Sequence, residues 1–364
     1  MQLIKSAKKL FVSGVITFSL IITGCSSNSA GGSGEKENTE AFNPDNANGQ
    51  TYDEVRANLG EVPKITAEIK LGAVAKAFEN EYWRTLKEGM EKGAQNFNDK
   101  GINLTVDVKS PQGEADEEGQ LSIVKDMINK KYTAMLLSPI SDSNLVPGVE
   151  SALDAKIPVI NVNDGIIKEA PNFVGPKADQ NGATAAEWIS DKVGGKGKVA
   201  IIVGMPKAFA ARQRTIGFEN WIKDNSPDIE ITEKQNADWD RSKAKDIAAT
   251  WIKKHDDLNA IFANNDTMAL GAQEAVNESG KDILVVGVDG IGEAYESIRK
   301  GEMDATIDSF PLYKGQIAVE MILRQLGGQE LPRVIWTPQA IIDSTNVDTP
   351  AEEIINWSEP TVGK

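Results

Sequence analysis

From residue 64 onward, short apolar runs alternate with longer segments of helical period, and this alternation constrains the fold more than any other feature of the sequence. Runs such as YTAMLLS (132–138), KVAIIVG (198–204) and ILVVGVD (283–289) carry apolar residues at successive positions. Strands of this kind lie in parallel sheets that helices cover on both faces. The pattern therefore predicts an α/β protein.

The strand-like runs form two successive sets, and each set predicts one doubly wound lobe. A folded part of about 300 residues also favours two lobes over one. The predicted strands cover 67–75, 102–108, 132–138, 157–163 and 172–175 in the first set, and 198–204, 229–235, 258–264, 283–289 and 303–309 in the second. The predicted helices cover 83–98, 115–130, 178–193, 208–224, 241–255, 267–279 and 292–300.

Ligands of such sheets bind beyond the carboxyl ends of the strands, so the residues that follow each strand are the candidates for a site. Here they are amides, carboxylates, hydroxyls, one arginine and large aromatic rings. An amide or carboxylate can pair with two adjacent hydroxyls, and a flat ring can cover an apolar C–H face. The set therefore suits a polyhydroxylated ring such as a sugar. The candidates are Asn80, Tyr82, Trp83, Asn163, Asp164, Arg212, Trp239, Asn265, Asp289 and Ser309.

Several of these positions have a structural alternative. We expect Asp266 to cap the helix that begins there rather than to bind a ligand. Tyr82 and Trp83 could belong to the buried face of their helix. Arg212 could be a surface charge, although its place after a strand end favours the site. Trp239 lies in a strand-to-helix loop, where stacking on a ligand is the better explanation for a large ring.

The sequence indicates a binding protein rather than an enzyme. His255, its single histidine, lies among charged residues in KKHDD and is assigned to the surface. The segment GVDGIG (287–292) follows a strand, but its glycines have the spacing G-x-x-G-x-G, and Asp289 would face a bound pyrophosphate. We therefore predict no catalytic residue, no cofactor and no metal site.

The start of the chain indicates export. Lys5, Lys8 and Lys9 precede an apolar run of about 13 residues, whereas a bilayer span takes about 20. This arrangement is typical of a signal peptide. The boundary ITGC (22–25) resembles the lipobox of bacterial lipoproteins, which implies a signal peptide over 1–24 and a lipid on Cys25. An ordinary secretory signal with an incidental cysteine is the alternative.

The segment after Cys25 is poor in large apolar residues and rich in Ser, Gly, Asn and Glu, so we predict a flexible tether over 25–60. Three of the 39 basic residues and none of the 54 acidic residues precede Cys25, which leaves a net charge of −18 on the rest of the chain. So acidic a protein is not expected to bind nucleic acid.

Several motifs at the strand ends resemble the type 1 periplasmic binding proteins of the ribose-binding kind, the sugar-capturing components of ABC importers. They are NEYWRTLKEG (80–89), IPVINVND (157–164), AARQRTIGF (210–218), IFANNDTMALGA (261–272) and VVGVDG (285–290). The resemblance covers roughly residues 64–347 and implies two lobes joined by three crossovers, with the ligand between them. The first lobe would comprise 61–176 plus 310–337, and the second 177–309 plus 338–350.

The resemblance also implies roles for single residues, but this sequence differs from ribose binders at some of the positions. Ribose binders carry Asp-Arg where this chain has Asn163-Asp164, and Gln where it has Ser309, so another pentose, a hexose or a cyclic polyol is equally open. By position, the residues that match the family's ligand-binding set are Asn80, Tyr82, Trp83, Arg212, Trp239, Asn265 and Asp289.

The function that the resemblance implies is that of an extracytoplasmic lipoprotein. It would capture a monosaccharide or related polyol as a monomer, deliver it to an ABC transporter permease, and attach to the outer face of the cell membrane through its lipid alone. The main alternative is a sensor that presents a sugar or autoinducer to a signalling receptor. A sugar-responsive repressor is disfavoured, because an export signal and a tether stand where its DNA-binding domain would be. An exported enzyme and a nucleoside binder are the remaining alternatives.

Overall fold

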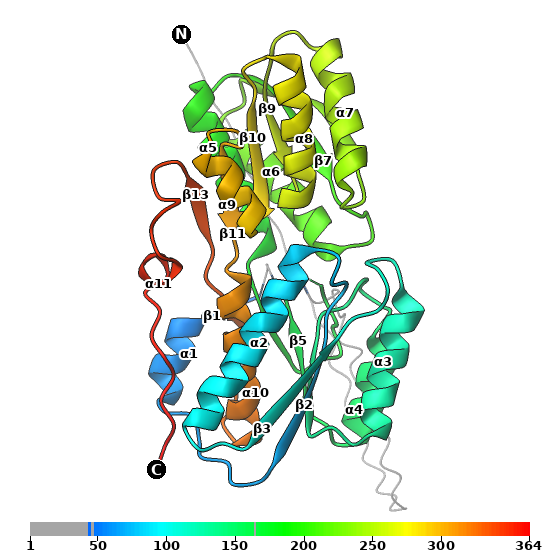
Figure 1. The fold of residues 1–364 in the computed structure, drawn as a ribbon, viewed down its shortest axis with the longest axis vertical. Coiled ribbons are helices and arrows are strands. Elements are labelled where there is room, and N and C mark those ends of the chain that lie inside the picture. Colours follow the sequence, from blue (N-terminus) through cyan, green and yellow to red (C-terminus); the bar gives the residue numbers. More distant parts are fainter. Residues whose placement is uncertain (1–42, 45–46, 164) are drawn as a thin grey trace, which may run out of the picture. The chain divides into compact units, whose positions relative to one another are not determined.

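Two parallel sheets form the framework of the protein in the computed structural model, which describes residues 43–44, 47–163 and 165–364 (Figure 1). The first sheet has the order β1 (Gln50–Thr51), β12 (Val334–Trp336), β6 (Asn172–Gly175), β5 (Val159–Val162), β4 (Ala134–Leu137), β2 (Ile69–Val74) and β3 (Leu104–Lys109). The second has the order β13 (Ala340–Asp343), β11 (Ala305–Asp308), β10 (Leu284–Asp289), β9 (Leu258–Ala263), β7 (Gly197–Val203) and β8 (Ile229–Asn236). In the described residues β13 is the one antiparallel strand, and it pairs with β11.

Helices pack on both sheets and define the two lobes. Those of the first lobe are α1 (Tyr52–Leu59), α2 (Glu81–Asp99), α3 (Glu117–Asn129), α4 (Val146–Asp154) and α10 (Pro311–Leu326). Those of the second lobe are α5 (Ala178–Val193), α6 (Phe209–Asn225), α7 (Arg241–Lys254), α8 (Asp266–Ser279) and α9 (Gly292–Arg299).

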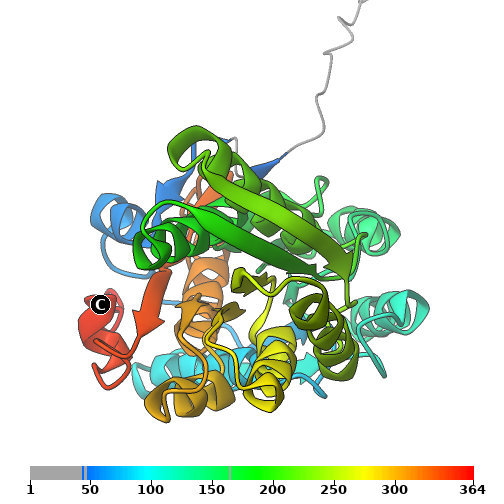
Figure 2. The ribbon, with the colours of Figure 1, turned by 90° about the horizontal axis from the view of Figure 1, so that it is seen from above.

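The apolar strands are buried on both faces, as their sequences predict. In β7, Val199, Ile201 and Val203 pack in an apolar cluster with α5 and α6. Ala200 and Ile202, which point the other way, pack in a second cluster with α7 and α8. Figure 2 shows these two pairs of helices on opposite sides of the sheet. Alternate side chains of one strand thus hold two helical layers.

Within the described residues three crossovers link the two sheets, between β6 and α5, between β11 and α10, and between β12 and β13. The last residues of the chain then return to the first lobe, a fourth passage that is described below. The predicted fold class, two doubly wound lobes joined by three crossovers, is therefore confirmed. The carboxyl ends of the two sheets face each other across these crossovers (Figure 1).

The predicted tether over 25–60 is wrong for its last part. Residues 50–59 form β1, which pairs with β12, and α1. Thr51 and Glu54 form a capping box at the start of α1, and Tyr52 and Val55 bury its apolar side against the first lobe. The segment is therefore folded although its overall composition is polar, because its few apolar and capping side chains and the pairing of β1 with β12 attach it to the first lobe.

The chain also continues beyond residue 350, where the second lobe was predicted to end. After β13 and the short helix α11 (Ala351–Ile354), it returns to the first lobe, where Val362 forms a bridge with Val62 (Figure 1). Trp357 stacks on Tyr52 with ring centroids 5.8 Å apart, and meets Tyr313 edge-on at 4.9 Å. We call residues 344–364 the C-terminal strap.

The predicted signal peptide and Cys25 lie outside the described residues. Among the helices that the structure does describe, none is both long and apolar enough to span a membrane.

Candidate ligand-binding site between the lobes

An inner cavity lies between the facing edges of the two sheets, and both lobes contribute to its wall. From the first lobe it is lined by Lys76, Asn80, Tyr82, Trp83 and Glu114. From the second lobe it is lined by Arg214, Trp239, Asn265 and Asp289. The structure thus brings together six of the predicted site residues, namely Asn80, Tyr82, Trp83, Trp239, Asn265 and Asp289.

The first turn of α2 forms the wall on the side of the first lobe. Asn80 caps this helix, since its Oδ1 accepts a hydrogen bond from the backbone N of Tyr82 at 3.0 Å. Its Nδ2 donates to Glu114 Oε1 at 3.2 Å, and the indole Nε1 of Trp83 donates to the same oxygen at 3.0 Å. The rings of Tyr82 and Trp83 are perpendicular, with centroids 5.1 Å apart. Glu114 thereby fixes both an amide and a ring of the wall.

Trp239 supplies the opposite aromatic surface. It follows β8 in a loop where Asp238 and Trp239 have φ angles of 55° and 67°, in the left-handed region that larger residues seldom adopt. Its ring lies directly on Gly204, where an added Cβ would approach the indole to 2.2 Å. A glycine at 204 is therefore required for the indole to reach the cavity.

Asn265, rather than Asp266, caps α8, so the expectation for Asp266 was wrong. Asn265 Oδ1 accepts from the backbone N of Met268 at 3.0 Å, which leaves its NH2 group as a donor at the cavity wall. Asp266 is fully buried instead, and its Oδ2 accepts from the backbone N of Gly290 at 2.8 Å and of Ile291 at 3.1 Å. It therefore holds the loop that follows Asp289.

Arg214 occupies the place that was predicted for Arg212. Its guanidinium is 2% exposed and donates to the backbone O of Asn264 at 2.6 Å and to Asp289 Oδ1 at 3.1 Å. Arg212 is partly exposed and forms an ion pair with Asp142 of the first lobe. Arg212 and Arg214 are two positions apart on α6, a rotation of about 200° around the helix axis, so only one of these arginines can face the cavity. The sequence did not show which, because it did not fix the rotation of α6.

Asn163 and Ser309 do not line the cavity wall but lie in a buried cluster behind Tyr82. Asn163 Oδ1 accepts a short hydrogen bond from the Tyr82 hydroxyl. Lys314 Nζ, from α10, lies 2.6 Å from the Tyr82 hydroxyl, 2.9 Å from Asn163 Oδ1 and 3.1 Å from Ser309 Oγ. Asp164, the remaining candidate, falls outside the described residues.

Sequence reasoning missed Lys76, Glu114, Arg214 and Lys314. Lys76 and Glu114 follow the ends of β2 and β3, so the rule that selected the other candidates could have found them. Lys76 is buried, with its Nζ 5.3 Å from the centroid of the Trp83 ring. Lys314 gave no such signal, because it lies inside a helix rather than after a strand.

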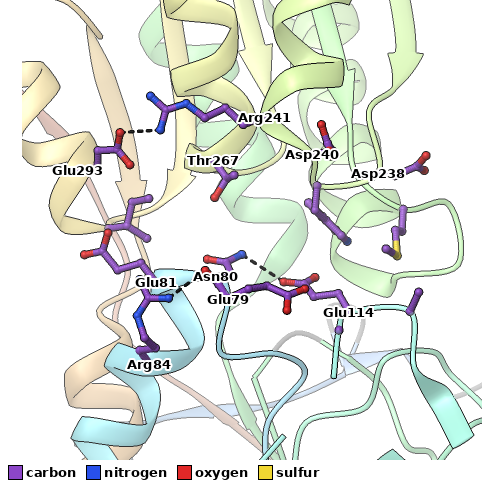
Figure 3. Close-up of a pocket in the computed structure, with 15 residues that line it drawn as sticks. Glu79, Asn80, Glu81, Arg84, Glu114, Asp238, Asp240, Arg241, Thr267 and Glu293 are labelled. Carbon is purple, nitrogen blue, oxygen red and sulfur yellow. Dashed lines mark hydrogen bonds and ion pairs between the residues drawn. The ribbon is translucent and has the colours of Figure 1, made fainter. Parts of the chain in front are cut away.

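Figure 3 shows an outer cavity of about 580 Å³. It shares Asn80, Glu114 and Trp239 with the inner cavity. Arg241 in its wall pairs with Glu293 at 2.6 Å, and Glu81 Oε1 accepts from the backbone N of Gly292 across the lobes at 2.9 Å. The excess of carboxylates disfavours anionic ligands. The charged residues in its wall are Glu79, Glu81, Glu114, Asp238, Asp240 and Glu293, against Arg84 and Arg241.

No group of three or more His, Cys, Asp or Glu in the described part of the chain is arranged to hold a metal ion. The inner cavity instead combines fixed acceptors, fixed donors and two aromatic surfaces. The inner cavity has a volume of about 20 Å³, which is smaller than a sugar ring, so a small polar ring would need space from the outer cavity or a slight parting of the lobes. With that space, these groups can bind the ring by hydrogen bonds at its edge and by apolar contact with its faces.

Comparisons with known proteins agree with this geometry. Residues 71–330 match the family described as periplasmic binding protein domain. The ribose import binding protein of Bacillus subtilis is 35% identical over 272 residues, covering 74% of this chain and 86% of that protein. The D-allose-binding periplasmic protein of Escherichia coli is 33% identical over 278 residues, covering 73% of this chain and 88% of that protein.

Among solved structures, an ABC transporter periplasmic solute binding protein from Actinobacillus succinogenes with bound D-allose superposes with a TM-score of 0.71 at 30% identity. The match covers 78% of this chain and 100% of that one. The matched family domain stops short of α1 at one end and of the C-terminal strap at the other.

Proposed function

Because the chain belongs to the periplasmic binding protein domain family, we propose that it captures a monosaccharide or related polyol between its lobes and delivers it to an ABC importer. The observation that carries this proposal is the inner cavity, whose wall holds both hydrogen-bond donors and acceptors from both lobes. The relatives named for ribose and allose make aldoses of five or six carbons the first candidates.

The hydrogen-bonding groups of the cavity suit hydroxyls in particular. Asp289 and Glu114 offer carboxylate oxygens, which accept, whereas Arg214 and the Asn265 NH2 group donate. Each sugar hydroxyl donates one hydrogen and also accepts, so a ring of hydroxyls can pair with such a mixed set. A site of this kind rejects analogues that lack a hydroxyl, because a buried polar group is then left unpaired.

The aromatic residues suit the faces of the same ligand. Trp83 from the first lobe and Trp239 from the second would cover its C–H groups, so neither lobe alone would provide the whole set of contacts. Tyr82 in the wall, with Asn163 and Ser309 behind it, completes the part of the proposed site that the structure describes, and Asp164 stays a candidate from the sequence. Capture would therefore couple ligand binding to lobe closure.

The lobes are in contact around the cavity, and these contacts support a closing movement. Lys207 of the second lobe pairs with Glu117 of the first at 2.6 Å, and Arg212 pairs with Asp142 in the same way. On the other side of the outer cavity Glu81 accepts from the backbone N of Gly292 at 2.9 Å. Such contacts form only when the facing ends of both sheets are close together.

We further propose that the protein is a lipoprotein. Cleavage before Cys25 and lipidation of its thiol would attach a monomer to the outer face of the cell membrane. Metabolic labelling with a radioactive fatty acid should mark the wild type and leave Cys25→Ser unmarked. Equal labelling of both proteins would refute the proposed anchor.

Calorimetric titration of the chain carrying Cys25→Ser with D-ribose, D-allose, myo-inositol and a nucleoside tests the proposed function. A sugar at 100 times its Kd should also stabilise the protein against unfolding by about 2.7 kcal/mol. Binding of the nucleoside, with no response to any sugar or polyol, would overturn the proposed ligand class.

Replacing Trp239 by Ala should weaken binding of the same sugar by about 1–3 kcal/mol, because a large ring is removed from the cavity wall. Trp221→Ala is the matched control, since Trp221 lies on α6 outside the inner cavity. Unchanged affinity in Trp239→Ala would remove Trp239 from the site.

A further inference from the structure

Lys314 is a fully buried lysine in the first turns of α10, directly after the crossover from β11. Its ammonium is 0% exposed and lies within hydrogen-bond distance of Tyr82 of α2, Asn163 after β5, and Ser309 after β11. Tyr82 and Asn163 belong to the first lobe, and Ser309 directly follows β11, the last parallel strand of the second. One charged group thus links three segments that meet behind the cavity wall.

The chemistry of these groups fixes the direction of each hydrogen bond. A lysine ammonium donates three hydrogens and accepts none, so both the Tyr82 oxygen and Asn163 Oδ1 act as acceptors toward it. The hydroxyl hydrogen of Tyr82 is then directed to Asn163 Oδ1. A flipped Asn163 amide would turn its NH2 group toward the ammonium, where both groups donate. Lys314 therefore holds the Asn163 amide in one of its two orientations.

The other end of the Asn163 amide is buried as well. Asn163 is 0% exposed, and its Nδ2 has no hydrogen-bond partner among the residues that the structure describes. A buried donor of this kind is satisfied by an acceptor atom that binds beside it. Asn163 does not line the inner cavity itself, but it contacts Tyr82, which does, so a ligand that widens this small cavity beside Tyr82 can bring an oxygen atom to the Asn163 NH2 group.

We propose that Lys314 is a positioning residue of the binding site, which holds the Tyr82 hydroxyl and the Asn163 amide so that Asn163 offers its NH2 group to a ligand oxygen. Lys314 touches no ligand itself but determines the polarity of a residue that does. This inference rests on the proposed function, in which a hydroxylated ligand occupies the inner cavity.

The first test is a double-mutant cycle on the affinity for D-allose and D-ribose. Lys314→Met, which keeps the length of the side chain but removes its charge and donors, should raise Kd roughly tenfold or more. In an Asn163→Ala background the same substitution should change Kd by less than about threefold, because the group through which Lys314 acts is gone. Equal effects in both backgrounds, or an unchanged Kd in Lys314→Met, would overturn the proposal.

Two further variants separate positioning from folding. Tyr82→Phe removes the hydroxyl that accepts from Lys314 without changing any charge, and should also raise Kd while the ligand-free protein melts as a single cooperative unit. Lys300→Met, an exposed lysine after α9, is the matched control and should bind as the wild type does. An unchanged Kd in Tyr82→Phe would contradict the hydrogen-bond chain.

A measurement without ligand separates this inference from the proposed function. The side-chain NH2 resonances of Asn163, assigned by their loss in Asn163→Ala, should move in the ¹⁵N NMR spectrum of Lys314→Met and stay in place in Lys300→Met. Unmoved resonances in Lys314→Met would overturn the positioning role even if sugars bind. If no sugar binds the wild type, the proposed ligand class fails and this spectrum still decides whether Lys314 orients the amide.

Discussion

Asp266 and Asp308 are carboxylates buried at the ends of α8 and β11, beneath the loop that follows Asp289. Burial raises the pKa of Asp266 to about 6 and that of Asp308 to about 7, although hydrogen bonds offset part of the effect. Asp308 accepts from the Tyr295 hydroxyl at 2.8 Å and from the backbone N of Phe310 at 2.6 Å. Both groups support the backbone around the site without lining the cavity.

Replacing Asp308 by Asn should change how stability depends on pH. A carboxyl whose pKa is raised on folding, here from 3.8 to about 7, favours the native state below pH 4 and loses this contribution as the pH rises through the folded pKa. The unfolding free energy of the wild type relative to Asp308→Asn should therefore fall by roughly 3 kcal/mol between pH 4 and 8. Urea titrations at each pH measure this difference.

Asp246→Asn is the control for this experiment, because Asp246 lies on the exposed side of α7. The Asp246→Asn series measures how far the loss of an exposed carboxylate changes the unfolding free energy at each pH. A difference for Asp308→Asn that changes with pH no more than that of Asp246→Asn would contradict the raised pKa.

For single residues, the sequence predicted the kinds of residue that line the inner cavity better than their identities. Strand ends located Asn80, Asn265 and Asp289, because the ends of parallel strands meet at one edge. The choice between Arg212 and Arg214 depends on the rotation of α6, which packing against α5 determines. Lys314 required the three-dimensional arrangement of three separate segments.

The packing of α5 on α6 determines where Arg214 lies, and a glycine makes this packing close. An added Cβ at Gly182 of α5 would lie 1.8 Å from the backbone O of Arg214. Gly182→Ala should therefore push the helices apart, lower the unfolding free energy by about 1–3 kcal/mol and weaken sugar binding.

Gln180→Ala, on the exposed side of the same helix, is the matched control and should leave both properties unchanged. Urea titration and calorimetry measure the two effects separately. Full stability and affinity in Gly182→Ala would show that α5 and α6 can separate without cost to the site.

Elements with strong local patterns were predicted closely, and those that depend on distant contacts were not. The predicted helix 178–193 and the predicted strand 172–175 coincide with α5 and β6. β12 spans three residues, too few to show a periodic pattern, and it forms because β1 and β6 flank it. The capping box at Thr51 was readable in the sequence, but the polar composition around it concealed it.

At the scale of the whole molecule, the ion pairs Arg212–Asp142 and Lys207–Glu117 connect the lobes directly. Partly exposed pairs contribute about 0–1 kcal/mol each, and salt screens them. A variant with both Arg212→Gln and Lys207→Gln should therefore bind sugar up to about tenfold more weakly at low salt and show less change with ionic strength. Titrations at two salt concentrations measure both effects.

Lys234→Gln provides the control, because Lys234 pairs with Glu219 at 2.5 Å within the second lobe. It should not change the affinity at either salt concentration. If the double variant behaves in the same way, the two pairs between the lobes make no contribution to closure.

The C-terminal strap has a practical consequence for optical sensors built from this protein. The backbone N of Gly363 donates to Val62 O at 2.9 Å, so the end of the strap is attached to the first lobe. A fluorophore at the end of the strap would therefore move together with one attached near residue 60. Such a donor–acceptor pair would keep its separation, and its energy transfer, whether the ligand is bound or free. A responsive sensor needs one of the two dyes on the second lobe, for example at the exposed Lys196 in the turn after α5.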